Sequence, residues 1–156
     1  MLLRKSIYFA SPLFSVAERI DNERICRALE RWCDVFLPQR DGELIPSLIQ
    51  RGVSKNDAYR IVFNRDVTAI KRCDALVINL DGRTIDEGAA FELGLAHGLG
   101  KTCVGYHTDS RVLLPYGINP MISVPLSETF VCLEDLVDWA KDFCSSGVSQ
   151  RPKLVR

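Results

Sequence analysis

Short apolar runs alternate with longer stretches of helical periodicity along this chain. Apolar runs bounded by turn residues are typical of buried strands, and they occur at residues 6–10, 35–37, 75–80, 102–106 and 129–132. Apolar residues recurring every three or four positions predict helices over residues 15–32, 57–72, from about 87 onward, and 133–144. The polar stretch 39–54 predicts a loop with a short helix. Residues 110–124 predict a longer loop.

Strands alternating with long helices predict one α/β domain over residues 1–145, followed by a flexible tail over residues 146–156. The simplest arrangement is a five-stranded parallel sheet of flavodoxin- or Rossmann-like order 2-1-3-4-5, with helices on both faces. Ligands of such sheets bind at the carboxyl ends of the strands, near the switch point between strands one and three. Ser11, Gln39, Asp81 and Asp86 follow strands and are therefore expected there. No GxGxxG or GxxxxGK sequence follows the first strand, so we expect no phosphate-cradling loop.

One carboxylate, Glu92, occupies an unusual position on the helix that starts near residue 87. Asp86 is a plausible N-cap for this helix. The residues one turn away from Glu92 are all uncharged: Gly88, Ala89, Leu95 and Ala96. A buried, unpaired carboxylate is costly and usually shifts its pKa, which makes Glu92 a candidate functional residue. The alternative is that this face of the helix is simply open to water.

Composition and charge narrow the class of protein. Twenty basic residues balance twenty acidic ones among 156, so we expect neither a nucleic-acid nor a membrane partner. No apolar run is long enough to span a membrane, and the apolar segment after Arg4 and Lys5 is too short for a signal peptide. We therefore expect a cytoplasmic protein whose six cysteines are reduced and mostly buried. With two histidines and no ligand spacing, we expect neither a metal site nor a cofactor.

Four segments match the motifs of one known family, in the same order and at compatible separations. They are Ile7-Tyr8-Phe9-Ala10 with Phe14, the stretch Asn64-Arg65-Asp66-Val67-Thr68-Ala69-Ile70, the pattern Asp86-x-Gly88-x-x-x-Glu92-x-Gly94, and Asn119-Pro120-Met121-Ile122. Together they resemble the nucleoside 2-deoxyribosyltransferase family. The resemblance extends over residues 6 to about 125.

The resemblance implies catalytic roles for four of these residues. Glu92 resembles the nucleophile that attacks C1′ of deoxyribose, and Asp86 resembles the carboxylate that orients the sugar or Glu92. Asp66 resembles the acid that protonates the leaving base, and Tyr8 the hydroxyl that positions the nucleophile. These roles suit cleavage of an N-glycosidic bond, because a carboxylate can capture the sugar as an ester while an acid assists the base. Asp66 needs a raised pKa to be an acid at neutral pH.

The resemblance also implies substrate contacts. Phe14 lies where an aromatic residue would wall the base, and Gln39 lies where a glutamine would contact it. Asn119 resembles a group that binds the 5′-hydroxyl in a neighbouring subunit's site, and Met121 belongs to the same element. The family suggests dimers, often arranged as hexamers. Asp81 and Gly88, which follow the third strand, complete the expected substrate-binding set.

The chain departs from the family pattern at its C-terminus. Some members place a terminal tyrosine and carboxylate in the site, whereas this sequence ends with Lys153-Leu154-Val155-Arg156.

Three functions are compatible with these residues. The first is a deoxyribosyltransferase of nucleoside salvage, acting on a nucleoside and a free base. The second is a hydrolase of the same fold that cleaves nucleoside 5′-monophosphates, and it is kept open by Ser11, Ser15 and Arg19 near the first turn. The third is a non-catalytic nucleotide-binding module, which would not need three carboxylates together.

Five of the candidate site residues could instead have a purely structural role. Asp86 could serve only as an N-cap, and Asp66 could be a solvated helix residue. Tyr8 could be core packing, Asn119 a turn residue and Gln39 loop surface.

Overall fold

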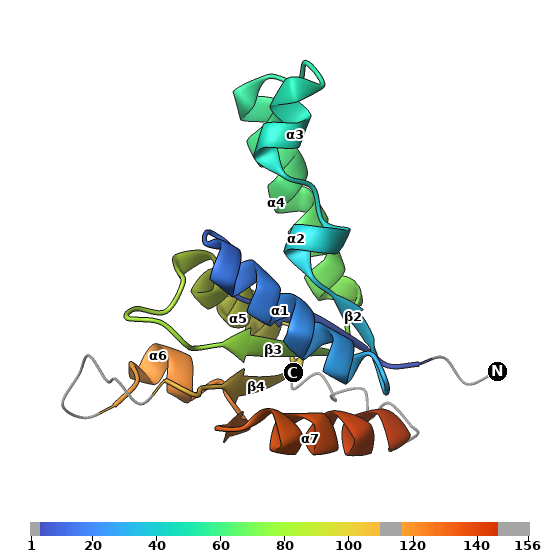
Figure 1. Ribbon diagram of the computed structural model, residues 1–156, viewed down its shortest axis with the longest axis vertical. Helices are drawn as coiled ribbons and strands as arrows, with labels where there is room; N and C mark the ends of the chain where they lie inside the picture. Colours follow the sequence, from blue (N-terminus) through green and yellow to red (C-terminus); the bar gives the residue numbers. More distant parts are fainter. Residues whose placement is uncertain (1–3, 110–116, 147–156) are drawn as a thin grey trace, which may run out of the picture.

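A five-stranded parallel sheet organises the computed structural model, which describes residues 4–109 and 117–146 (Figure 1). The strand order is β2-β1-β3-β4-β5, so the predicted α/β fold and its order 2-1-3-4-5 are confirmed. The strands are β1 Ser6–Ala10, β2 Asp34–Phe36, β3 Ala75–Asn79, β4 Thr102–Tyr106 and β5 Glu128–Phe130. The tail that we expected over residues 146–156 lies outside the described residues, apart from Ser146.

Helices join the strands at the places that the apolar periodicity predicts. They are α1 Val16–Leu29, α2 Pro38–Asp41, α3 Ile45–Gln50, α4 Lys55–Arg72, α5 Glu87–Gly98, α6 Pro120–Ser123 and α7 Leu133–Ser145. The prediction of one short helix within residues 39–54 is wrong, because two form there. Each of these starts with a proline in its first turn, where the missing N–H costs nothing. The same preference starts α6 at Pro120, inside the predicted loop.

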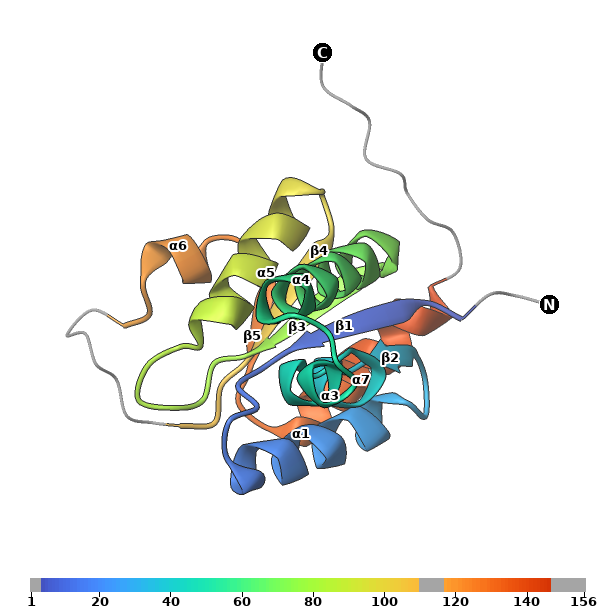
Figure 2. The same cartoon turned by 90° about the horizontal axis from the view of Figure 1, so that it is seen from above.

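Alternate residues of the strands face two separate cores. Ile7 and Phe9 of β1 point into a core closed by α1 and α7. Tyr8 and Ala10 point into a core closed by α4 and α5. Figure 2 shows α4 and α5 on one side of the sheet and α1 on the other. The period of two along a strand thus directs the Tyr8 side chain toward the two helices that carry Asp66 and Glu92.

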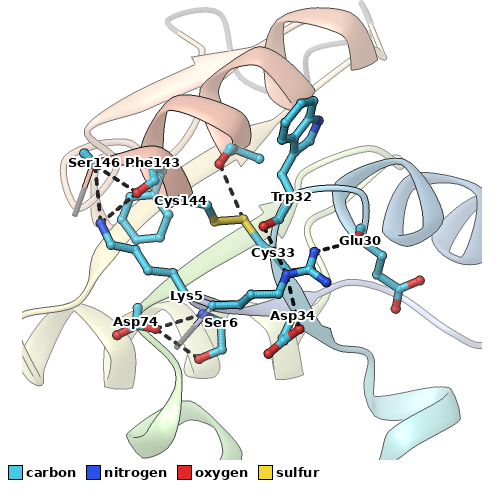
Figure 3. The surroundings of a disulfide bond; sticks show 12 residues. Lys5, Ser6, Glu30, Trp32, Cys33, Asp34, Asp74, Phe143, Cys144 and Ser146 are labelled. Atoms are coloured by element: carbon cyan, nitrogen blue, oxygen red, sulfur yellow. Dashed lines mark hydrogen bonds and ion pairs between the residues drawn. A yellow bond between two sulfur atoms is a disulfide. The ribbon is translucent and has the colours of Figure 1, made fainter. Parts of the chain in front are cut away.

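The Cys33–Cys144 disulfide ties α7 to the loop before β2 (Figure 3). The expectation that all six cysteines are reduced is therefore wrong for this pair. It rested on a missing secretory signal, and a pairing across 111 residues leaves no spacing pattern to detect. Beside the disulfide, Lys5 Nζ donates to Phe143 O at 2.7 Å and lies 3.3 Å from Ser146 Oγ.

Two further observations concern membrane-spanning helices and metal-binding groups. Within residues 4–109 and 117–146, no helix is long and apolar enough to cross a bilayer. Over the same residues, no three His, Cys, Asp or Glu side chains are grouped so that they could hold a metal ion.

Candidate active site

The carboxylate of Glu92 finds its partner on β1 rather than on its own helix. Tyr8 Oη donates to Glu92 Oε1 at 2.6 Å, across 84 residues of sequence. The Tyr8 ring is held in place by stacking on Phe36, with 5.4 Å between ring centroids. The face of α5 that carries Glu92 is therefore packed toward the sheet and is not simply open to water.

A second carboxyl group, that of Asp66, approaches the same pair from α4. Its Oδ1 is buried and has no hydrogen-bond partner among the described residues. Asp66 lies close enough for its charge to raise the pKa values of both Tyr8 and Glu92. The interpretation of Asp66 as a solvated helix residue is thereby excluded.

The pKa values in this cluster favour neutral forms. Burial raises the pKa of Glu92 to about 8, the Tyr8 hydrogen bond opposes that rise, and the charges of Asp66 and Asp86 add to it. Burial raises the pKa of Asp66 to about 6, opposed by Arg65. Burial, followed by the charge of Glu92, also raises the pKa of Tyr8. Two carboxyl groups with separated pKa values, both near neutrality, are typical of sites that perform acid–base or nucleophilic chemistry.

Asp86 is the N-cap of α5, as its position predicts. Its Oδ2 accepts from the Ala89 backbone N–H at 2.7 Å, so α5 begins at Glu87 and presents Glu92 on its second turn. A side chain at position 88 would place its Cβ 3.1 Å from Asp86 Oδ2, so Gly88 leaves room for this carboxylate. The cap uses one oxygen of Asp86, which leaves the other for a second contact.

A pocket of about 410 Å³ opens at the carboxyl ends of β1 and β3. Its lining includes Pro12 and Phe14 from the turn after β1, and Asp81, Arg83 and Asp86 from the loop after β3. This is the predicted switch point. A larger cavity of about 640 Å³ lies along β2 and α4. Of the clustered residues Tyr8, Asp66, Asp86 and Glu92, Asp86 lines the smaller pocket and none lines the larger one. We therefore place the candidate site at the smaller pocket.

The fold, the carboxylate cluster and the pocket agree with one family. Residues 7–146 match the family profile described as nucleoside 2-deoxyribosyltransferase. The chain belongs to the nucleoside 2-deoxyribosyltransferase family. A comparison with functionally curated proteins gave no significant match.

Solved structures with the same fold include a 2-deoxyribosyltransferase. A conserved protein from Enterococcus faecalis is 27% identical, with a TM-score of 0.69, over 90% of this chain and 99% of that chain. A 2-deoxyribosyltransferase from Bacillus psychrosaccharolyticus is 27% identical, with a TM-score of 0.67, over 85% and 90%. A CMP N-glycosidase from Clostridium botulinum, at 17% identity and a TM-score of 0.52 over 86% and 97%, shares the fold.

In this member of the family, three of the predicted substrate-binding residues have structural partners of their own. Asp81 accepts hydrogen bonds from the backbone N–H groups of Thr108 and Asp109 and so holds the segment after β4. Asn119 caps α6, with its Oδ1 accepting from the Met121 backbone N–H at 2.9 Å. Gln39 is bonded on both sides of its amide. By contrast, Phe14 is 76% exposed and Met121 is 79% exposed.

Not all predicted residues of this family member meet at one point. Tyr8, Asp66, Asp86 and Glu92 form one electrostatic cluster, and Phe14 and Asp81 share the pocket with Asp86. Asn119 caps α6, Met121 lies on it, and α6 contacts α5. Their roles in catalysis or binding stay predictions.

Sequence reasoning missed Asn22 and Arg83. Asn22 is completely buried and lies on the same stripe of α1 as the buried Ile25, Cys26 and Leu29. A polar residue on an apolar stripe was the available signal. No local pattern distinguishes Arg83 from any other basic residue in a loop.

Proposed function

We propose that this protein transfers 2-deoxyribose from a deoxynucleoside to another nucleobase through a covalent ester on Glu92. The observation that carries the proposal is the part-buried hydrogen bond from Tyr8 to Glu92, beside Asp66, whose pKa burial raises to about 6. A non-catalytic binding module would have no use for a stability-reducing pair of buried carboxyl groups. Membership of the family supports the same reaction.

The first step breaks the glycosidic bond. A carboxylate oxygen of Glu92 forms a bond to C1′ while the bond from C1′ to the base nitrogen breaks, and Asp66 donates its proton to the leaving base. The pKa of about 6 for Asp66 keeps a fraction of this acid protonated near neutral pH. In the second step the incoming base attacks C1′, Asp66 recovers a proton from it, and Glu92 leaves as the carboxylate.

The Tyr8 hydroxyl has two roles in this mechanism. Its hydrogen bond lowers the pKa of Glu92 against the effect of burial, so it increases the ionised fraction of the nucleophile. It also holds Oε1, which leaves Oε2 as the oxygen that attacks. Asp86, whose second oxygen is not used by the helix cap, is the candidate ligand of the sugar hydroxyl.

Base contacts come from Phe14 and Gln39 in this proposal. Phe14 presents an exposed ring at the mouth of the pocket, and a base that stacks on it would cover that ring. Gln39 lies at the carboxyl end of β2, beside β1. Asp81 lines the same pocket as Phe14, and Gly88 leaves room for the Asp86 carboxylate.

We further propose a homo-oligomer in which Asn119 and Met121 complete the site of a neighbouring copy. Exposed aromatic residues support an interface near the cluster. Phe63 of α4 and Phe91 of α5 lie 6.0 Å apart, and Tyr59 lies one turn before Phe63. Exposed apolar groups that gather in this way mark interaction surfaces. A cytoplasmic location and a role in nucleoside salvage belong to the same proposal.

A base-exchange assay tests the reaction. Deoxyinosine and free adenine should give deoxyadenosine and hypoxanthine, and omission of adenine should leave only slow hydrolysis, because a bound base is held for attack while water is not. A 2′-fluoro-substituted deoxynucleoside should slow both steps and trap the ester. Intact-mass spectrometry should then show one added sugar on the peptide that contains Glu92. An adduct on Asp86 or Asp81 would reassign the nucleophile.

A 5′-monophosphate hydrolase is the second candidate, and one observation favours it. Arg83 lines the pocket and has no hydrogen-bond or ion-pair partner among residues 4–109 and 117–146, so a phosphate would satisfy it. The groups near the first turn argue the other way. Ser15 caps α1, and Arg19 is bonded to the carbonyl oxygens of the turn. Strong cleavage of deoxyinosine 5′-monophosphate with little cleavage of deoxyinosine would favour the hydrolase.

A further inference from the structure

Two side-chain amides connect three segments at the carboxyl end of the sheet. Asn22 Nδ2, on the second turn of α1, donates to the carbonyl oxygen of Pro12 at 2.8 Å and to Gln39 Oε1 at 3.0 Å. Gln39 Nε2 donates in turn to the carbonyl oxygen of Arg19 at 2.9 Å. The turn after β1, the first half of α1 and the short helix α2 are thereby joined.

The chemistry of the two backbone carbonyls determines how both amides are oriented. A carbonyl oxygen only accepts hydrogen bonds. The group that faces Arg19 O must therefore be the amino group of Gln39, and the group that faces Pro12 O must be the amino group of Asn22. The remaining contact then pairs Gln39 Oε1 with the second N–H of Asn22. Turning either amide over would bring two acceptors together, so one orientation of Gln39 satisfies every contact.

Asn22 keeps this arrangement at a cost to stability. Its side chain is completely buried, and its Oδ1 has no partner among the described residues. A buried acceptor without a partner destabilises the fold. Its neighbours on the same stripe, Ile25 and Leu29, are apolar and buried, and an apolar residue at position 22 would remove the orphan oxygen. The two donated hydrogen bonds are what an apolar residue could not supply.

We propose that Asn22 is a positioning residue that sets the base selectivity of the site by fixing the amide orientation of Gln39. The inference rests on the proposed function, in which Gln39 contacts the base. Each end of the Gln39 amide holds one protein partner, so one N–H and one lone pair remain, at fixed places, for a ligand. Gln39 is half-buried, so part of the residue is open to a ligand.

A fixed amide discriminates between bases that differ by one exocyclic group. Adenine presents an amino group at the position where hypoxanthine presents a carbonyl oxygen, and cytosine and uracil differ in the same way. A fixed donor or acceptor pairs with one member of each pair and opposes the other, which is a strong form of selectivity. An amide that is free to turn over can suit both members. Loss of Asn22 removes the donor to Gln39 Oε1 and leaves the Arg19 carbonyl as the remaining described group that orients the amide. It should therefore relax the selectivity more than it slows the reaction.

A competition assay measures this selectivity directly. The protein is given 2′-deoxyguanosine with equal amounts of adenine and hypoxanthine, and the product ratio reports the ratio of kcat/KM values. Cytosine and uracil with thymidine as the donor serve if only pyrimidines are accepted. Wild-type protein should favour one acceptor by at least about tenfold, and Asn22→Ala should bring the ratio to within about threefold of one. The change should lie in KM of the two acceptors rather than in kcat.

A matched variant separates positioning from general loss of stability. Ile25→Val removes one methylene group from the buried residue one turn along the same stripe, and it should keep the wild-type product ratio. A wild-type ratio near one, or a folded Asn22→Ala protein that keeps the wild-type ratio, would overturn the proposal.

The orientation of Gln39 is also tested without any enzyme activity. In ¹⁵N-labelled wild-type protein, the Gln39 side-chain proton that is donated to Arg19 O, assigned by its loss in Gln39→Glu, should exchange slowly with water. It should exchange faster in Asn22→Ala. If wild-type protein transfers no sugar to any base, the proposed function fails, while this measurement still judges the amide geometry. If Asn22→Ala does not fold, rapid exchange of Gln39 in the wild type alone would refute the fixed orientation.

Discussion

Replacing Tyr8 by phenylalanine removes one hydroxyl group from the site and leaves the ring stacked on Phe36. The hydroxyl donates to Glu92 at 2.6 Å, and it stabilises the ionised carboxylate. A hydrogen bond to a charged group contributes about 1.5–3 kcal/mol, which corresponds to about 1–2 pKa units. Without it, the pKa of Glu92 should rise from about 8 to about 9–10.

The rate of transfer depends on a minor protonation state of the pair. The reaction needs Glu92 ionised and Asp66 protonated, whereas pKa values of about 8 and about 6 place the proton mainly on Glu92. The productive form is then about 1% of the singly protonated enzyme. Tyr8→Phe should reduce this share by about 10- to 100-fold, and the maximum of kcat/KM should fall by the same factor.

The pH profile makes the prediction specific. In wild-type protein, kcat/KM should be bell-shaped, with limbs near pH 6 and pH 8 and a maximum near pH 7. In Tyr8→Phe, the alkaline limb should move up to about pH 9–10 while the acid limb stays in place. Initial rates of base exchange at low deoxyinosine, measured from pH 5 to 10, give both limbs.

A packing variant provides the control for this experiment. Phe36→Leu disturbs the ring of Tyr8 but keeps its hydroxyl, so it should leave the alkaline limb near pH 8. A Tyr8→Phe profile that falls equally at every pH, with both limbs unchanged, would refute the role of the hydroxyl. A profile that rises to an alkaline plateau would show that Asp66 is not the acid.

Three other variants test separate parts of the structure. Glu92→Gln should lose more than about 1,000-fold in exchange activity. The raised pKa of Glu92 means that the folded state retains a proton that the unfolded state releases between pH 4.5 and about 8, so this carboxyl group reduces stability as pH rises through that window. The gain in Tm of Glu92→Gln over wild type should therefore grow from pH 5 to pH 8, and a constant difference would contradict the shift. Reduction of Cys33–Cys144, which closes a loop of 111 residues, should remove about 4–5 kcal/mol and lower Tm by about 10–15 °C. Cys33→Ala should show the same loss and no further response to reductant, whereas Cys132→Ala, which removes one of the free thiols, should respond like wild type. Asn119→Ala should be folded but weak at low substrate, and refolding it together with Glu92→Ala should restore about a quarter of wild-type activity, because half of randomly paired dimers carry one intact site. Activity equal to the mean of the two separate variants would show that Asn119 does not act across an interface.

The sheet and its long helices could be predicted because their residues repeat the periods of regular structure. Continuous apolar runs marked the strands, and Asp86 marked the start of α5 by the ordinary chemistry of an N-cap. The short helices were harder to predict from the sequence. Both α2 and α3 span less than two turns, so they carry no periodicity, and the prolines that start them also occur in loops.

The site was predicted in part, for a physical reason that differs from residue to residue. Glu92 was visible because its own helix offers no partner, but the partner itself, Tyr8, was named only by resemblance, since the contact spans 84 residues. The same limit hid the Cys33–Cys144 bond. Asn22 shows the opposite case, because its position on an apolar stripe was readable, whereas the partners that explain it lie on two other segments.

The contact between Lys5 and the end of α7 has a consequence for chain connectivity. Lys5 Nζ lies 3.3 Å from Ser146 Oγ, at the amino end of the sheet and therefore opposite the pocket. A short peptide could join these two positions, and new termini could open at the exposed turn formed by Arg51 and Gly52. In such a circular permutant, Cys33 and Cys144 would be separated by roughly 35 residues instead of 111, so the cross-link would contribute about 1 kcal/mol less to stability. In this permutant the strands would be synthesised in a different order but would pair in the same order in the sheet.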